Sequence, residues 1–185
     1  IYQMSFERGK TVKPLTKIGD SKKTGTKVRF YADDTIFETL EYEYEVLENR
    51  FREMAFLTKG LSIELEDQRE EVPRTARFCF EGGLKEFVND INEKELISQI
   101  ISFNDKDGEV EIDIALAYNN SYSEKLLSFV NNIRTIEGGT HESGFRMGLS
   151  RAIMNYIDTN ANGRDKKKKI QGDDIREGLV AIVSA

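Results

Sequence analysis

EGGTHESGFR, residues 137–146, places two adjacent glycines directly before an amphipathic segment. Glycine adopts backbone angles that other residues avoid, so Gly138-Gly139 marks the end of one element and the start of another. Beyond the glycines, apolar side chains recur at helical spacing at Phe145, Leu149, Ile153 and Tyr156. The stretch therefore predicts a strand-to-helix junction, followed by a helix over 140–158 with one buried face.

On both sides of this junction the pattern predicts a sheet. Residues 110–118 alternate apolar and polar after the hairpin signal Asp107-Gly108, and Leu179–Val183 is a continuous apolar run, typical of a strand covered on both faces. Residues 84–91 have the apolar spacing of a helix, and Asp173 or Asp174 can begin a short one. The second half is therefore predicted as α-β-β-β-α-β, with helices packed on a sheet.

The first half is predicted as a hairpin, a helix and a second hairpin. Tyr2–Phe6 and Thr26–Tyr31 alternate and are expected to pair across a long connection. A 3-4-3-4-3 apolar spacing over 37–54 predicts a helix that ends near Gly60 and packs against a sheet. Strands are expected at 61–65 and 78–80, and the domain boundary is placed at Gly82-Gly83.

Composition limits the class of protein. Of the 185 residues, 38% are hydrophobic and 32% charged, and the net charge is −6, which argues against DNA binding by bulk charge but permits a local patch. No apolar run reaches the roughly 20 residues of a membrane helix. The single cysteine, Cys79, is expected to be a buried thiol in a reducing compartment. Because the chain lacks an initiator Met, we expect it to be a fragment.

Four features are candidate sites, each with a structural alternative. His141 is the only histidine, so a hydrogen bond is favoured over a metal site. Gly138–Thr140 could present N–H groups to an anion, although a structural junction is favoured. Lys166–Lys169 could contact phosphate or form a solvated loop. Arg146 lies about 100° round the helix from Phe145 and is expected to face away from the core.

A weaker signal lies in the predicted strand at 26–31. Thr26 and Val28 are two residues apart, so their side chains share one face of a strand. A hydroxyl and a branched apolar side chain could line a small pocket there.

Four ordered motifs resemble the ATPase subunit of bacterial type II DNA topoisomerases, the family of gyrase B and topoisomerase IV B. They are Lys23–Phe30 (KTGTKVRF), Phe80–Gly83 (FEGG), Ser128–Phe145 with its GGTHESGF ending, and Gly172–Leu179 (GDDIREGL). The resemblance covers essentially the whole chain. It implies an α+β fold, an α/β sandwich: residues 1–82 would end a gyrase/Hsp90/histidine kinase/MutL-type ATPase domain, and 83–185 would form a ribosomal-protein-S5-like transducer domain.

The resemblance also implies a function and its site residues. Such enzymes couple ATP and Mg²⁺ to DNA strand passage in the bacterial cytoplasm, as a dimer of this subunit with a DNA-cleaving A subunit. Thr26 and Val28 would lie at the adenine of ATP, and Arg146 would line the cavity that holds DNA. The family's catalytic glutamate and Mg²⁺-binding asparagine would precede Ile1, and its phosphate-contacting lysine would follow Ala185. We therefore expect no catalytic residue, no metal site and no tightly bound ATP in this chain.

Alternatives remain open at this stage. Topoisomerase IV B shares the motifs, although Asn131-Asn132-Ile133 favours gyrase. A stand-alone S5-like module could present Arg146 and the lysine run to nucleic acid. A MutL-like repair ATPase would share the fold, but it would not be expected to carry the Gly-Gly-Thr-His sequence.

Overall fold

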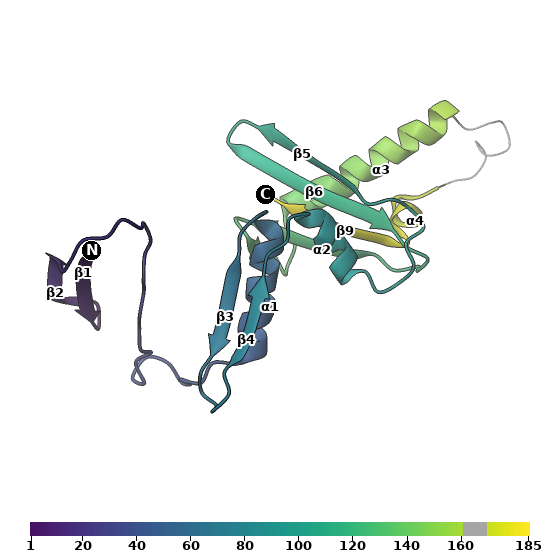
Figure 1. Ribbon diagram of the computed structural model, residues 1–185. Coiled ribbons are helices and arrows are strands. Elements are labelled where there is room, and N and C mark those ends of the chain that lie inside the picture. Colours follow the sequence, from purple (N-terminus) through teal and green to yellow (C-terminus); the bar gives the residue numbers. More distant parts are fainter. Residues whose placement is uncertain (161–169) are drawn as a thin grey trace. The chain divides into compact units, whose positions relative to one another are not determined.

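The computed structural model describes residues 1–160 and 170–185 (Figure 1). The lysine run at 166–169 lies outside the described residues. By its contacts the chain divides into two units, Ile1–Glu43 and Tyr44–Ala185. The predicted boundary at Gly82-Gly83 therefore falls inside the second unit. Among the described residues, no helix is long and apolar enough to cross a membrane.

In the first unit, strands β1 (Tyr2–Glu7) and β2 (Lys10–Lys17) form an antiparallel hairpin. The turn residues Arg8 and Gly9 have φ angles of 49° and 78°, the pair of positive values that a type I′ hairpin turn requires. The expected strand at 26–31 is wrong, because this segment has no strand assignment and pairs with no other strand among the described residues. Alternation alone does not form a strand without a neighbour to receive its hydrogen bonds.

The second unit begins with helix α1 (Tyr44–Leu57), seven residues later than the spacing predicts. Phe37 and Leu40 are 55% and 46% exposed, so the first part of the apolar seam has little to pack against. Helix formation depends on tertiary burial of the apolar face, which explains the later start. Strands β3 (Ile63–Asp67) and β4 (Arg74–Phe78) follow as a hairpin.

A five-stranded mixed sheet forms the centre of this unit (Figure 1). Its order is β5-β6-β9-β7-β8, in which β9 is antiparallel to β6 and parallel to β7. The strands are β5 (Ile101–Asp107), β6 (Val110–Tyr118), β7 (Lys125–Val130), β8 (Ile133–Arg134) and β9 (Leu179–Ser184). The predicted Asp-Gly hairpin between β5 and β6 is confirmed, with Gly108 at φ 61°.

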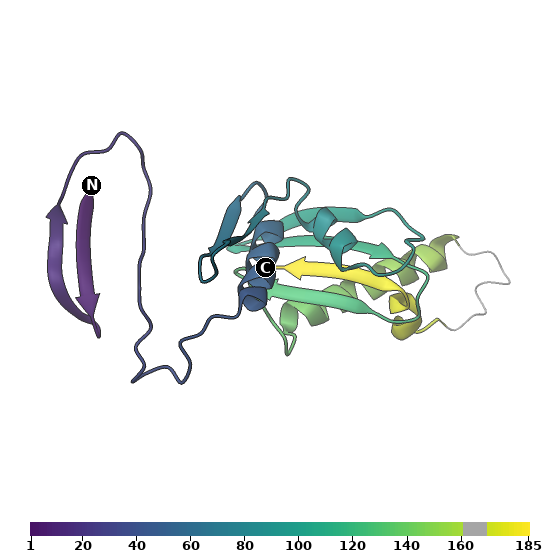
Figure 2. The same ribbon diagram turned by 60° about the horizontal axis from the view of Figure 1, so that its bottom comes forward.

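Helices cover both faces of the sheet (Figure 2). Helix α2 (Leu84–Ile91) lies on one face together with α1, and α3 (Thr140–Asn160) lies on the other. The short helix α4 (Gly172–Arg176) packs beside α3. The helix bounds at 84–91 and the start of α3 at Thr140 agree with the sequence prediction.

Strand alternation divides the core into two clusters. Side chains of β6 and β9 point alternately to the two faces, so the predicted double covering of the Leu179–Val183 run is confirmed. The cluster under α1 and α2 contains Phe56, Phe87, Val88, Ala115, Ala117, Phe129, Val180 and Ile182. The cluster under α3 contains Ile114, Leu116, Phe145, Leu179, Ala181 and Val183.

Two burial expectations are wrong. Cys79 is exposed, because its neighbours Phe78 and Phe80 point inward and alternation directs the thiol outward. On α3, Phe145 is buried and Leu149 packs on the core, but Tyr156 is 69% exposed. The apolar cluster therefore covers the beginning of this helix and not its full length.

Candidate functional site

The junction before α3 depends on its two glycines. Gly138 has a φ of 75°, a value that other residues rarely adopt. A Cβ added to Gly139 would lie 2.7 Å from the ring of His141. The chain therefore turns sharply here and brings the first turns of α3 over β7, where the polar side chains of the two elements meet.

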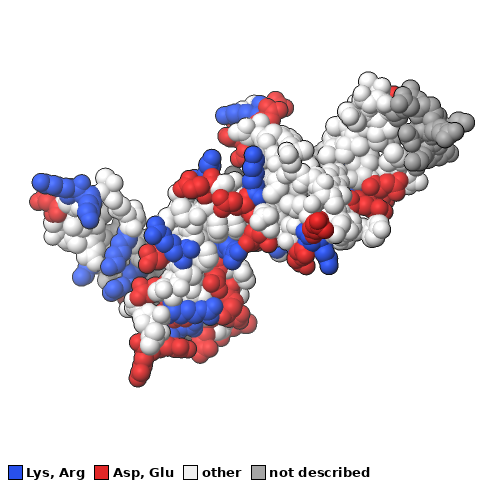
Figure 3. All heavy atoms as spheres, turned by 45° about the vertical axis from the view of Figure 1, so that its right-hand side comes forward, with Lys and Arg blue, Asp and Glu red and all other residues white. Residues whose placement is uncertain are grey.

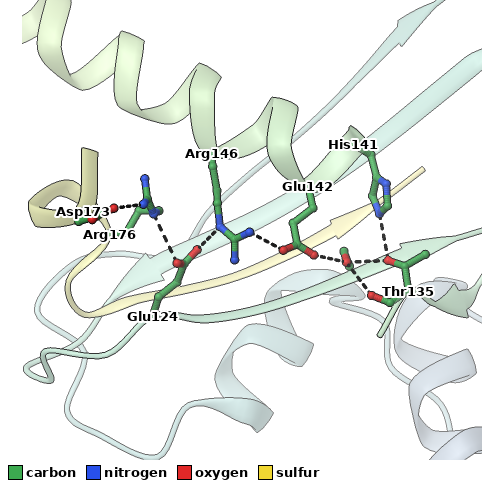
Figure 4. Close-up of polar contacts among 8 residues, drawn as sticks. Glu124, Thr135, His141, Glu142, Arg146, Asp173 and Arg176 are labelled. Atoms are coloured by element: carbon green, nitrogen blue, oxygen red, sulfur yellow. Dashed lines mark hydrogen bonds and ion pairs between the residues drawn. The ribbon is translucent and has the colours of Figure 1, made fainter. Parts of the chain in front are cut away.

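Arg146 lies at the centre of a network of polar side chains on this face (Figure 4). Its Nε donates to Glu124 Oε1 at 2.9 Å, and its Nη1 donates to Glu142 Oε1 at 2.5 Å. The hydrogen bond to Glu124 and the nearby charge of Glu142 raise the pKa of the guanidinium, which therefore stays charged. The Arg146 side chain is 36% exposed, so it points away from the apolar core but not freely into solvent.

On one side the network continues through hydroxyl groups to the start of α3. Ser128 Oγ donates to Glu142 Oε2 at 2.6 Å and lies 2.6 Å from Thr135 Oγ1. Thr135 Oγ1 is in turn 3.1 Å from Nε2 of His141. Ser128 faces α3 because its neighbour Phe129 points to the opposite face of the sheet. His141 thus forms the structural hydrogen bond that the sequence favoured.

On the other side Glu124 links α3 to α4. Its second carboxylate oxygen lies 3.4 Å from Nε of Arg176, and Arg176 also pairs with Asp173 (Figure 4). We use the name polar network for this whole set: Glu124, Ser128, Thr135, His141, Glu142, Arg146, Asp173 and Arg176. It holds two arginines against three carboxylates, so its formal charge is about −1 with His141 neutral.

Sequence reasoning identified Arg146 but missed its partners. The spacing of Glu142 and Arg146, four residues apart on a helix, is a readable signal for an ion pair. Glu124 lies 22 residues before Arg146 and on a different element, and no local pattern connects the two.

Thr26 and Val28, the predicted adenine contacts, lie in the first unit. Both are exposed, Val28 by 79%, and the segment that carries them is not a strand. A hydroxyl can hydrogen-bond a purine base, and a branched apolar side chain can pack against it. Within residues 1–160 and 170–185, no group of three His, Cys, Asp or Glu side chains could hold a metal ion.

A stack of aromatic rings joins the two sides of the predicted domain boundary. The ring of Phe56 on α1 lies 3.6 Å from that of Phe80 and 4.7 Å from that of Phe87 on α2, centroid to centroid and nearly parallel. Phe87 in turn lies 5.9 Å from Phe129 on β7. We call Phe80, Phe56, Phe87 and Phe129 the aromatic stack.

Two arginines near the middle of α1 add polar contacts to this joint. Arg52 pairs with Asp90 of α2. Arg50 Nη2 donates to the carbonyl oxygen of Asn132 at 2.7 Å, in the turn between β7 and β8. A shallow hollow of about 410 Å³ lies beside the stack. It is lined by Phe56, Phe80, Lys85, Glu86, Asn89, Asp90 and Ile100.

Comparison with known proteins identifies the family. A family model described as DNA gyrase B matches residues 83–185. The chain is 52% identical over 184 residues to the B subunit of DNA gyrase from Campylobacter jejuni, and 47% identical over 186 residues to the B subunit of DNA topoisomerase 4 from Bacillus subtilis. Both matches cover 100% of this chain but 24% and 28% of the relatives. The chain therefore spans about a quarter of the length of the curated relatives it matches.

The fold also matches that of a solved gyrase B structure. The 43K ATPase domain of Thermus thermophilus gyrase B, solved in complex with an aminocoumarin, matches with a TM-score of 0.86 and 31% identity. That match covers 99% of this chain and 50% of the other. The structure therefore has the fold of a gyrase-type ATPase region. The chain belongs to the DNA gyrase B family, and the predicted family and fold class are confirmed.

Proposed function

We propose that this chain is part of the B subunit of a type II DNA topoisomerase of the gyrase type, in which ATP binding and hydrolysis drive DNA strand passage. Residues 1–82 would be the end of its ATPase domain and 83–185 its transducer domain. The observation that carries the proposal is the 52% identity to gyrase B across the whole chain. Topoisomerase IV B is the alternative, because that relative is 47% identical.

The proposed role of the described residues is mechanical. Closely stacked rings cannot slide without losing contact area, and interiors packed at this density transmit displacement. The aromatic stack connects α1 to the sheet, so a movement of α1 would move α2 and β7 with it. This geometry suits a relay between a nucleotide site on one side of Gly82-Gly83 and DNA on the other.

ATP and Mg²⁺ would be held mainly by residues outside this chain. Thr26 would hydrogen-bond the adenine and Val28 would pack against it, while ATP supplies the energy for strand passage when bound to the whole subunit. We expect the 185-residue chain alone neither to hydrolyse ATP nor to hold it tightly. In the whole subunit, a Thr26→Ala variant should therefore bind nucleotide more weakly. An unchanged affinity would show that Thr26 does not contact the adenine.

DNA would meet the α3 face of the sheet. The Arg146 guanidinium is one-third exposed and held in a fixed direction by two carboxylates, so it can contact phosphate without reading sequence. The partners would be DNA, a second B subunit and the DNA-cleaving A subunit, and the location would be the bacterial cytoplasm.

The test is DNA-stimulated ATP hydrolysis by the whole B subunit with its A subunit. Arg146→Gln should lower hydrolysis in the presence of DNA more than hydrolysis without DNA, because the lost charge meets DNA and not nucleotide. Arg151→Gln is the matched control, since Arg151 is exposed on the same helix. Equal loss with and without DNA, or equal effects of both variants, would contradict the proposed contact. A subunit without any ATP-dependent strand passage would contradict the proposed function.

A further inference from the structure

Two short segments of this acidic chain carry clustered positive charge: residues 8–29, and the lysine run at 166–169, which lies outside the described residues. Residues 8–29 contain eight Lys or Arg and a single acidic residue, Asp20, for a formal charge of +7. The other residues contain 19 Lys or Arg and 32 Asp or Glu. We call Arg8–Arg29 the basic segment. It comprises the turn after β1, strand β2 and the extended chain beyond it.

Most of this charge is available to a partner. Every Lys and Arg of the basic segment is exposed. Figure 3 shows one face of the molecule, with Lys and Arg side chains (blue) at the surface among Asp and Glu (red). Two of its cations are compensated, since Lys17 pairs with Asp20 at 2.7 Å and Arg8 pairs with Asp33 at 2.6 Å. The others form no ion pair with any carboxylate in the described parts of the chain. These are Lys10, Lys13, Lys22, Lys23, Lys27 and Arg29.

The basic segment and Arg146 differ in how far nearby carboxylates compensate their positive charge. The two arginines of the polar network are outnumbered by carboxylates at 2.5 to 3.4 Å, so the group of side chains around Arg146 carries no net positive charge. Six cations without an ion pair within 22 residues attract phosphate more strongly. Strand β2 rises about 3.3 Å per residue, so Lys10 and Lys17 lie roughly 23 Å apart, the length of about seven base pairs of duplex.

We propose that the basic segment is a binding surface for the phosphate backbone of duplex DNA. The proposal rests on the proposed function for the choice of DNA as partner. Lysine side chains on a strand and an extended chain contact phosphates as point charges, so binding is independent of base sequence and strongly dependent on salt. Arg146 then acts as a local contact and not as the source of affinity.

The experiment measures binding of the 185-residue chain to a fluorescent 20-base-pair duplex without nucleotide, by anisotropy, between about 50 and 200 mM salt. The test variant replaces Lys10, Lys13, Lys22 and Lys23 by Gln. The control variant makes the same change in charge at Lys59, Lys85, Lys94 and Lys106, which are exposed and lie outside the segment. A Lys22→Gln/Lys23→Gln double variant alters no strand residue and therefore separates binding from folding of the hairpin.

We expect the test variant to bind at least about tenfold more weakly, with a salt slope smaller by up to about 3.6, or about 0.9 per lost contact. The double variant should show about half of that slope change, and the control variant should bind nearly as the parent does. Equal weakening by test and control variants, or no weakening by the double variant, would overturn the proposal. Poly-glutamate is added as a competitor at the same total negative charge as the duplex. If it displaces the duplex completely, the segment binds any polyanion, and the assignment to DNA is overturned.

The proposed function can fail separately from this surface. If the test variant binds like the parent while Arg146→Gln still lowers DNA-stimulated hydrolysis, the basic segment is excluded and the proposed function stands. If the whole subunit shows no ATP-dependent strand passage, the proposed function fails whatever the duplex titration shows.

Discussion

The two faces of the central sheet are built differently. Under α1 and α2, the aromatic stack includes three rings that are at most 3% exposed and within 6 Å of a neighbouring ring. Under α3, Phe145 and a smaller apolar cluster are bordered by the polar network, whose Arg146 is 36% exposed. The first face is held by close packing, and the second by packing and exchangeable polar contacts.

This difference indicates which face can rearrange. A packed ring that moves leaves a void, which costs free energy in proportion to its volume. A hydrogen bond or ion pair at the surface can be replaced by water or by phosphate at small net cost. The α1 and α2 face is therefore suited to transmit motion, and the α3 face to meet a charged partner.

The largest expected effect comes from removing a ring of the stack. Phe87→Ala should lower the free energy of unfolding of the 185-residue chain by about 3–5 kcal/mol, because its ring is buried between Phe56 and Phe129. Phe145→Ala is the matched change on the other face and should cost less, at or below about 3 kcal/mol, since Phe145 is 9% exposed and Phe87 is 3% exposed. Urea unfolding followed by circular dichroism measures both. A larger cost for Phe145→Ala would contradict the tighter packing of the α1 and α2 face.

A smaller effect is expected in the polar network. Glu124→Gln should cost about 0.5–1.5 kcal/mol, because Arg146 and Arg176 both lose a charged acceptor in a partly exposed site. The cost should shrink at about 0.5 M salt, where exposed charges are screened, whereas the cost of Phe87→Ala should not. Glu109→Gln, an exposed change in the β5–β6 turn, is the control. A salt-independent cost for Glu124→Gln would show that packing, and not charge, holds this face.

The smallest expected effect is the pH-dependent contribution of the ion pair between Arg74 of β4 and Glu45 of α1. A hydrogen bond from Arg74 lowers the pKa of Glu45 below its usual 4.5. The contact therefore contributes above about pH 4.5 and is lost as pH falls through the lowered value. In Arg74→Gln the Glu45 pKa should return toward 4.5, as measured by NMR titration of the side-chain carboxyl. An unchanged pKa would show that Arg74 is not its partner in solution.

Much of the sheet could be predicted because its signals are local. The alternation of β6, the Asp107-Gly108 turn and the apolar run of β9 each lie within ten residues, and the structure confirms all three. The predicted strand at 26–31 and the early start of α1 failed for the opposite reason. A strand needs a neighbouring strand to pair with, and an amphipathic helix needs a surface that buries its apolar face. The spacing of apolar residues does not show whether either is present. The strand at 2–6 was predicted to pair with residues 26–31 across a long connection. It pairs instead with β2, through the two-residue turn at Arg8-Gly9.

The candidate site was predictable only in part. Helical spacing identified Arg146 as a residue outside the core. The same spacing could have predicted its ion pair with Glu142, which lies four residues before it on the helix. The link from Glu124 to Arg176 joins residues 52 apart on different elements, so it depends on the topology of the sheet. The roles of Thr26, Val28 and Arg146 stay predictions.

If the aromatic stack couples nucleotide state to DNA movement, as proposed, the number of strand passages per ATP hydrolysed depends on its packing. In the whole B subunit with its A subunit, Phe56→Leu should lower this ratio while ATP hydrolysis continues, because α1 is no longer locked to α2. Val183→Ala, a buried change under α3, should leave the ratio as in the parent. An unchanged ratio in Phe56→Leu, or equal losses in both variants, would contradict the claim.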